Sequence, residues 1–166
     1  MTEKVRKDLD ALDLLMQDHR EVESLFRDFD YLKQSGGDTS SVMVRACAEL
    51  KIHDTLETEI FYAAIDAATD DEDVHDLLDD AEDAHDRVLE LIESFEQTRD
   101  EKQRETHFTM IVQHVTQHVR EEEDELFPLL RTLTELDLAS TAAAMKTRKA
   151  ELIPDTGIAE ADEETV

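Results

Sequence analysis

The sequence uses one short pattern twice, and this repetition limits the folds that the chain can adopt. Residues 53–62 and 118–127 each place a histidine four residues before a glutamate, followed by acidic and apolar residues and a final aromatic. Another histidine precedes each copy by a similar distance. The chain therefore contains a half-unit, His … His-x-x-x-Glu, in two copies, whose polar residues are His19, His53 and Glu57, then His85, His118 and Glu122.

The residues around this pattern have the spacing of amphipathic helices. Apolar side chains recur every three or four positions, and only 3 glycines and 2 prolines interrupt 166 residues. We expect Ser40 or Ser41 to cap the second helix, and Pro128 to kink or shorten the fourth. The predicted helices cover 8–34 and 41–68, then one that starts at the capping box Thr69-x-x-Glu72, one that starts at Thr98-x-x-Glu101, and a short one over 137–152.

Four long helices joined by short turns predict an all-α fold, an antiparallel up-down-up-down four-helix bundle with a short extra C-terminal helix. We expect one domain over residues 1–152, because the chain is long enough for a single core. The segment 153–166 contains a proline, a glycine and mostly acidic residues. It is predicted to be a disordered tail.

Both copies of the pattern fall on faces that are expected to be buried. In the second helix the inner positions are 46, 50, 53, 57, 60 and 64, and in the fourth they are 108, 111, 115, 118, 122, 126 and 129. Glu57 and Glu122 would then be buried carboxylates, which need cations or strong hydrogen bonds. Imidazole with carboxylate suits Fe, Mn or Zn, and residues at i and i+4 share one helical face. The duplicated pairs predict two metal ions about 3.5–4 Å apart, sharing the glutamates.

Other polar residues near the pattern are weaker ligand candidates. Glu82 precedes His85 by three residues, His114 precedes His118 by four, and Glu23 follows His19 by four. Symmetry does not support Glu23, because the matching position in the second half is Leu89. Tyr62 is expected to be a packing residue that can also donate a hydrogen bond near a bound ligand.

Charge, cysteine content and hydrophobicity argue against several kinds of partner and location. A formal net charge of −27 disfavours nucleic acid and anionic membranes as partners. The single cysteine, Cys47, cannot form an internal disulfide and is expected to be a small buried side chain. No signal peptide and no apolar run of membrane-spanning length is present, so we expect a cytoplasmic protein.

Taken in order, these residues resemble the hemerythrin-like HHE cation-binding domain family over roughly residues 9–135. The resemblance implies a non-haem centre of two Fe ions, replaceable by Mn or Zn, with a bridging oxo or hydroxo group. It assigns His19 and His53 to one iron and His85 and His118 to the other, with Glu57 and Glu122 as bridges. Oxygen carriers of the family have a further histidine where this chain has Ala81, so the site is expected to be more open.

The resemblance implies a di-iron protein that binds O₂, peroxide or NO in oxidative-stress defence or sensing, with redox catalysis left open. Alternatives are an iron-sensing or iron-handling protein without catalysis, a reversible oxygen-binding protein, and a metal-free helical interaction protein. A ferritin-like carboxylate centre needs Glu-x-x-His twice. Only Glu82 and His85 provide it, because Val115 stands three residues before His118.

Overall fold

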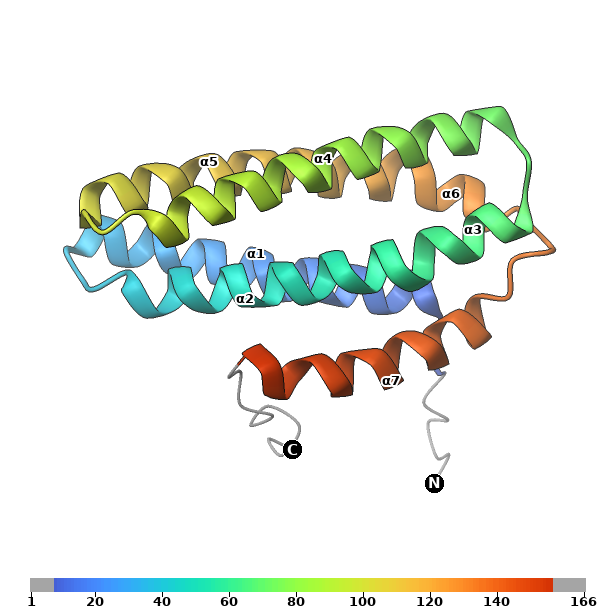
Figure 1. Cartoon of the computed structure of the whole chain (residues 1–166), viewed down its shortest axis with the longest axis horizontal. Coiled ribbons are helices and arrows are strands. Elements are labelled where there is room, and N and C mark those ends of the chain that lie inside the picture. Colours follow the sequence, from blue (N-terminus) through green and yellow to red (C-terminus); the bar gives the residue numbers. More distant parts are fainter. Residues whose placement is uncertain (1–7, 157–166) are drawn as a thin grey trace, which may run out of the picture.

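The computed structural model describes residues 8–156, and four long helical runs followed by one further helix form the molecule (Figure 1). The second and fourth runs each contain a short π-helical segment. The elements are α1 (Ala11–Ser35), α2 (Ser40–Leu56), η1 (Glu57–Phe61), α3 (Tyr62–Ala68), α4 (Glu72–Gln97), α5 (Glu101–Glu121), η2 (Glu122–Leu126), α6 (Phe127–Leu130) and α7 (Leu138–Thr156).

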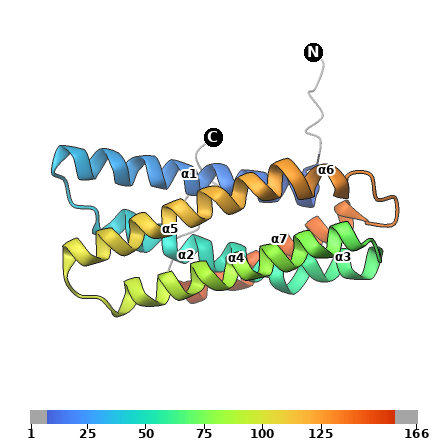
Figure 2. The same ribbon diagram turned by 90° about the horizontal axis from the view of Figure 1, so that it is seen from above.

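The four runs lie antiparallel, each reversing the direction of the one before (Figures 1 and 2). The most extensive contacts join α4 to α5 and α1 to α2, so the bundle consists of two helical hairpins. Each hairpin carries one copy of the repeated pattern. The predicted all-α bundle with an additional helix is confirmed.

The helix starts use different caps from those expected. The Asp71 side chain accepts from the backbone N–H groups of Asp73 and Val74, and Asp100 accepts from Gln103, so the predicted capping boxes at Thr69 and Thr98 were wrong. An aspartate next to the first turn reaches the free N–H groups directly and adds a favourable charge. The second helix begins after Thr39 without a side-chain cap from Ser40 or Ser41. Gly36 ends α1 in the left-handed conformation, which glycine adopts without steric cost.

The two π-helical segments begin at the two glutamates of the pattern. The N–H of Tyr62 donates to the carbonyl of Glu57, five residues earlier, and the N–H of Phe127 donates to that of Glu122. A π turn adds one residue, so the inward positions beyond it move by one. Sequence periodicity had placed Ile60, Ala64 and Leu129 inside. The side chains that are buried instead are those of Phe61, Tyr62, Ile65 and Leu130.

Two apolar clusters fill the bundle, one on each side of the repeated polar residues along its length. The cluster near the end of the second run includes Leu15, Phe61 and Leu126. The other, toward the opposite end, includes Phe26, Phe95 and Phe108, together with Cys47, which is buried as expected. The polar site therefore lies between two apolar parts of the core.

The last helix is longer than predicted. α7 continues to Thr156 and contains Pro154, so residues 153–156 are helical, and residues 157–166 of the expected tail lie outside the described residues. The helix lies along the outside of α1 and α2 (Figure 1). The fourth run ends at Leu130, two residues after Pro128, in agreement with the expected shortening. Within residues 8–156, no helix combines the length and the apolar character that crossing a bilayer requires.

Candidate metal centre

The six polar residues of the repeated pattern meet in the middle of the bundle. All are buried, with exposed fractions of at most 8 %. Their side chains form two groups whose potential ligand atoms lie within 4.8 Å of one another. His19 and His53 belong to one group and His85 and His118 to the other, while Glu57 and Glu122 belong to both. The arrangement is that of two adjacent cation sites with two shared carboxylates.

Some distances between these atoms are too long for hydrogen bonds, and all of those given below fit ligands of a common metal ion. His19 Nε2 lies 3.9 Å from Glu57 Oε1 and 3.8 Å from Glu122 Oε1, too far for hydrogen bonds. Atoms about 2.0–2.2 Å from one ion are about 3 Å apart at right angles and about 4 Å apart when opposite. In the second group the Nε2 atoms of His85 and His118 are 2.9 Å apart, and His85 Nε2 is 3.1 Å from Glu57 Oε2.

Several of these buried atoms have no hydrogen-bond partner. They include His19 Nε2, Glu57 Oε1 and Glu122 Oε1, all of which face the centre. An unsatisfied buried carboxylate oxygen or imidazole nitrogen is costly, so few persist in a folded protein without a reason. A cation at each group would satisfy these atoms, and the donor set of imidazoles and carboxylates suits such a cation.

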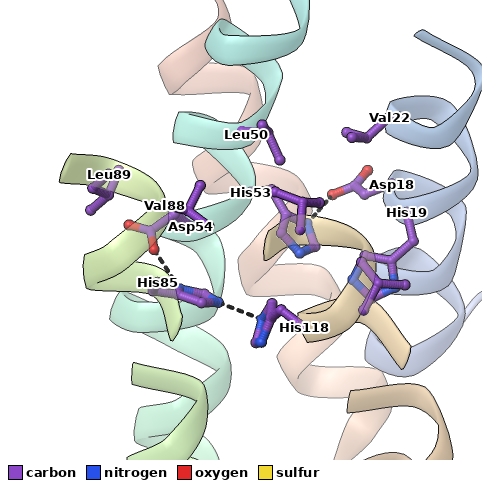
Figure 3. Close-up of a pocket in the computed structure, with 12 residues that line it drawn as sticks. Asp18, His19, Val22, Leu50, His53, Asp54, His85, Val88, Leu89 and His118 are labelled. Carbon is purple, nitrogen blue, oxygen red and sulfur yellow. Dashed lines mark hydrogen bonds and ion pairs between the residues drawn. The ribbon is translucent and has the colours of Figure 1, made fainter. Parts of the chain in front are cut away.

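Carboxylates outside the centre orient three of the four imidazoles. Nδ1 of His19 lies 2.7 Å from Glu123 Oε2 and Nδ1 of His53 lies 3.2 Å from Asp18 Oδ2. Nδ1 of His85 forms an ion pair with Asp54 (Figure 3). Because an ionised carboxylate can only accept, Nδ1 of His19 and of His53 carries the proton and donates it. In the neutral ring Nε2 is then left with a lone pair toward the centre, as metal-binding histidines require.

The buried histidines and carboxylates of the centre shift one another's pKa values. Burial by itself lowers the pKa of His85, but Glu57 and Asp54 raise it to about 10. The pKa of His53 is likewise raised well above its usual value despite burial, by Glu57 and Asp18. Burial would raise the pKa of Glu57, yet the neighbouring histidines, His53 foremost, hold it well below the usual value. Without metal, protons on His53 and His85 would therefore balance the charge of Glu57.

Tyr62 joins the centre more closely than sequence reasoning suggested. Its hydroxyl donates to Glu57 and lies 3.2 Å from Glu122 Oε2 and 3.1 Å from His85 Nε2. Tyr62 follows Glu57 by five residues, which a regular α-helix would turn away from the glutamate. The π turn brings both to one side. In the sequence, the only sign of this role of Tyr62 was its position as the aromatic residue that ends the repeated pattern.

Among residues 8–156, neither group of potential metal ligands includes Glu82, His114 or Glu23. Glu82 is exposed, and His114 is only half-buried. Glu23 accepts hydrogen bonds of 2.7 and 2.8 Å from Arg20. The structure thus brings together the six residues of the duplicated pattern and leaves these three outside.

Two cavities adjoin the centre. A small one, about 30 Å³, lies over the four imidazoles and is walled by apolar side chains that include Val22, Leu50 and Val88 (Figure 3). A larger one, about 260 Å³, lies beside His118 and Glu122 and is lined by Ala81. Ala81, the residue that was expected to make the site more open, therefore borders a cavity.

Comparison with known proteins agrees with this geometry. The family model described as the hemerythrin HHE cation binding domain matches residues 10–130, most of the chain and all six central residues. Comparisons with curated proteins and with solved structures give no match. The chain therefore belongs to the hemerythrin family of HHE cation-binding domains and is a metal-binding protein.

Proposed function

We propose that this protein holds two iron ions and binds O₂ or a related small oxidant, peroxide or NO, in oxidative-stress defence or sensing. The observation that carries the proposal is the pair of buried groups that share Glu57 and Glu122. His19 and His53 would hold one ion, and His85 and His118 the other. Mn or Zn fits the same donor atoms. Iron at these positions would supply the electrons that reduce a bound oxidant.

The surroundings of the centre favour a small ligand. The apolar cavity over the imidazoles measures about 30 Å³, and a cavity of about 10–15 Å³ already holds one water, so a ligand of that size fits. A diatomic molecule of low polarity suits such walls better than an anion does, because charge is costly to bury. The cavity at Ala81 gives the second group of ligands a neighbouring space that a larger side chain would fill.

Tyr62 would hold a proton at the shared carboxylates. Burial, followed by the charges of Glu57 and Glu122, raises the pKa of its hydroxyl far above the usual value, so the group stays protonated. A protonated hydroxyl next to both glutamates would be a hydrogen-bond donor for an oxidant held near them. Its replacement by phenylalanine would keep the ring and remove that donor.

The test is the fate of the oxygenated protein. Anaerobically loaded ferrous protein is exposed to O₂, and its visible spectrum is followed before and after evacuation. Recovery of the starting spectrum supports reversible binding, whereas turnover of added hydrogen peroxide supports an enzyme. A loaded protein whose spectrum responds to neither O₂, peroxide nor NO would overturn the proposal and leave iron sensing or handling.

A further inference from the structure

The helix α7 reaches the centre through a chain of two polar contacts. Lys149 Nζ donates to Asp18 Oδ1 at 2.9 Å, and Asp18 Oδ2 accepts from Nδ1 of His53 at 3.2 Å. The two oxygens of one carboxylate thus join a lysine on an outer helix to a central histidine. The family match ends at residue 130, before α7 begins at Leu138, so this lysine is not part of the matched domain.

The positive charge of Lys149 lies among three carboxylates. A cavity of about 60 Å³ between α1, α2 and α7 is lined by Lys149, by His53 and by the carboxylates of Asp18, Glu21 and Glu49. The ammonium group offsets the mutual repulsion of these three acids. Without it, Asp18 would be free to turn toward water and away from His53.

We propose that Lys149 is a positioning residue for the first half of the metal centre, and that its contact with Asp18 sets the affinity for the ion held by His19 and His53. Lys149 fixes Asp18, and Asp18 keeps the proton on Nδ1 of His53 and the Nε2 lone pair toward the ion. Groups that orient ligating histidines typically change metal affinity by about 10–100-fold. Lys149 acts one contact further out, and we expect a loss of about tenfold. This inference rests on the proposed ligand set.

The chain offers a matched control on the same helix. Arg148 also makes ion pairs, with Glu59 at 2.9 Å and Glu151 at 3.1 Å, but these glutamates are exposed and neither belongs to the centre. Arg148→Met therefore removes a cation from α7 without disturbing Asp18. Lys149→Arg is the conservative replacement, because it keeps a donor and a positive charge.

The experiment is optical titration of the metal-free protein with Co²⁺ alone, in which we expect two binding steps for the wild type. We expect Lys149→Met to weaken one step about tenfold. The other step should stay unchanged, as should both steps in Lys149→Arg and Arg148→Met. In the Asp18→Asn background, Lys149→Met should have no further effect, because both residues act through one contact chain. Far-ultraviolet circular dichroism establishes that each variant is folded, and Lys149→Gln replaces Lys149→Met if the latter does not fold.

Three results would overturn the inference while leaving the metal centre intact. They are wild-type affinities in the folded Lys149 variant, an equal loss in Arg148→Met, and an equal weakening of both steps. Fewer than two Co²⁺ ions bound by the wild type would overturn the ligand set and this inference with it.

Discussion

His53 in the first half of the centre and His118 in the second occupy matching positions in the repeat, yet their surroundings differ. Asp18 orients His53, and Lys149 on α7 holds Asp18 in turn. His118 instead borders the cavity at Ala81. A duplicated sequence has thus produced one set of ligands beside a cavity of about 60 Å³ and one set beside a cavity of about 260 Å³.

The same contrast appears at the outer histidines. His19 donates to Glu123, and Glu123 also pairs with Arg20, so a cation, a carboxylate and an imidazole follow one another as they do at His53. His85 pairs with Asp54. From this difference we expect the first half to bind an ion more firmly and the second half to be more accessible to an external ligand.

Removal of a shared carboxylate should have the largest effect, because it touches both halves. Glu57→Ala and Glu122→Ala are each expected to reduce the metal content by at least one ion per chain, as measured by elemental analysis of folded protein. The exposed neighbours Glu59→Ala and Glu125→Ala serve as controls and should bind as the wild type does. Unchanged stoichiometry in Glu122→Ala would refute its bridging role.

Removal of an orienting carboxylate should separate the halves. Asp54→Asn is expected to weaken the ion at His85 and His118 by about 10–100-fold, and Asp18→Asn the ion at His19 and His53. Competition with a metal chelator measures each step. If both variants weakened the same ion, the assignment of the histidines to two separate ions would be wrong.

Filling the larger cavity should affect access to the second half only. Ala81→Leu is expected to slow the binding of NO to the ferrous protein about tenfold, by occupying space beside His118, with two ions still bound. Stopped-flow absorption measures the rate. Ala84→Leu, one turn further along α4 and outside the cavity lining, is the control. Equal rates in both variants and the wild type would exclude this cavity as the route.

The smallest effect should be the pH dependence of the metal-free protein. The pKa of His85 is raised from 6.5 to about 10, so its stabilising charge is fully present below about pH 6.5 and is lost as the pH rises through about 10. Glu57 has a lowered pKa and contributes above its usual value of 4.5, a contribution lost as the pH falls below that value. Urea unfolding across this range should show a gradual decrease in the free energy of unfolding toward pH 10. Asp54→Asn should move that decrease to lower pH.

The bundle and its central residues could be predicted from the sequence, because both follow from helical periodicity and from the repeated pattern. Histidines and glutamates on apolar helical faces are conspicuous, and their duplication made a common site the economical explanation. Periodicity failed after Glu57 and Glu122, because it assumes a regular α-helix. The π turns moved the buried face by one residue and brought Tyr62 to the carboxylates.

Other features depend on contacts that no local pattern records. Asp71 and Asp100 proved to be the caps, where the sequence also offered threonines with a familiar spacing. The link from Lys149 to Asp18 joins residues 131 positions apart, on helices whose packing the sequence does not specify. Such long-range pairs become visible only with the fold.

The most direct test of the central claim is metal analysis of protein made in iron-replete cells and purified without oxygen, together with its visible spectrum. We expect two iron ions per chain and a spectrum that changes when O₂, peroxide or NO is added. Fewer than one metal ion per chain would contradict a di-iron centre at His19, His53, Glu57, His85, His118 and Glu122.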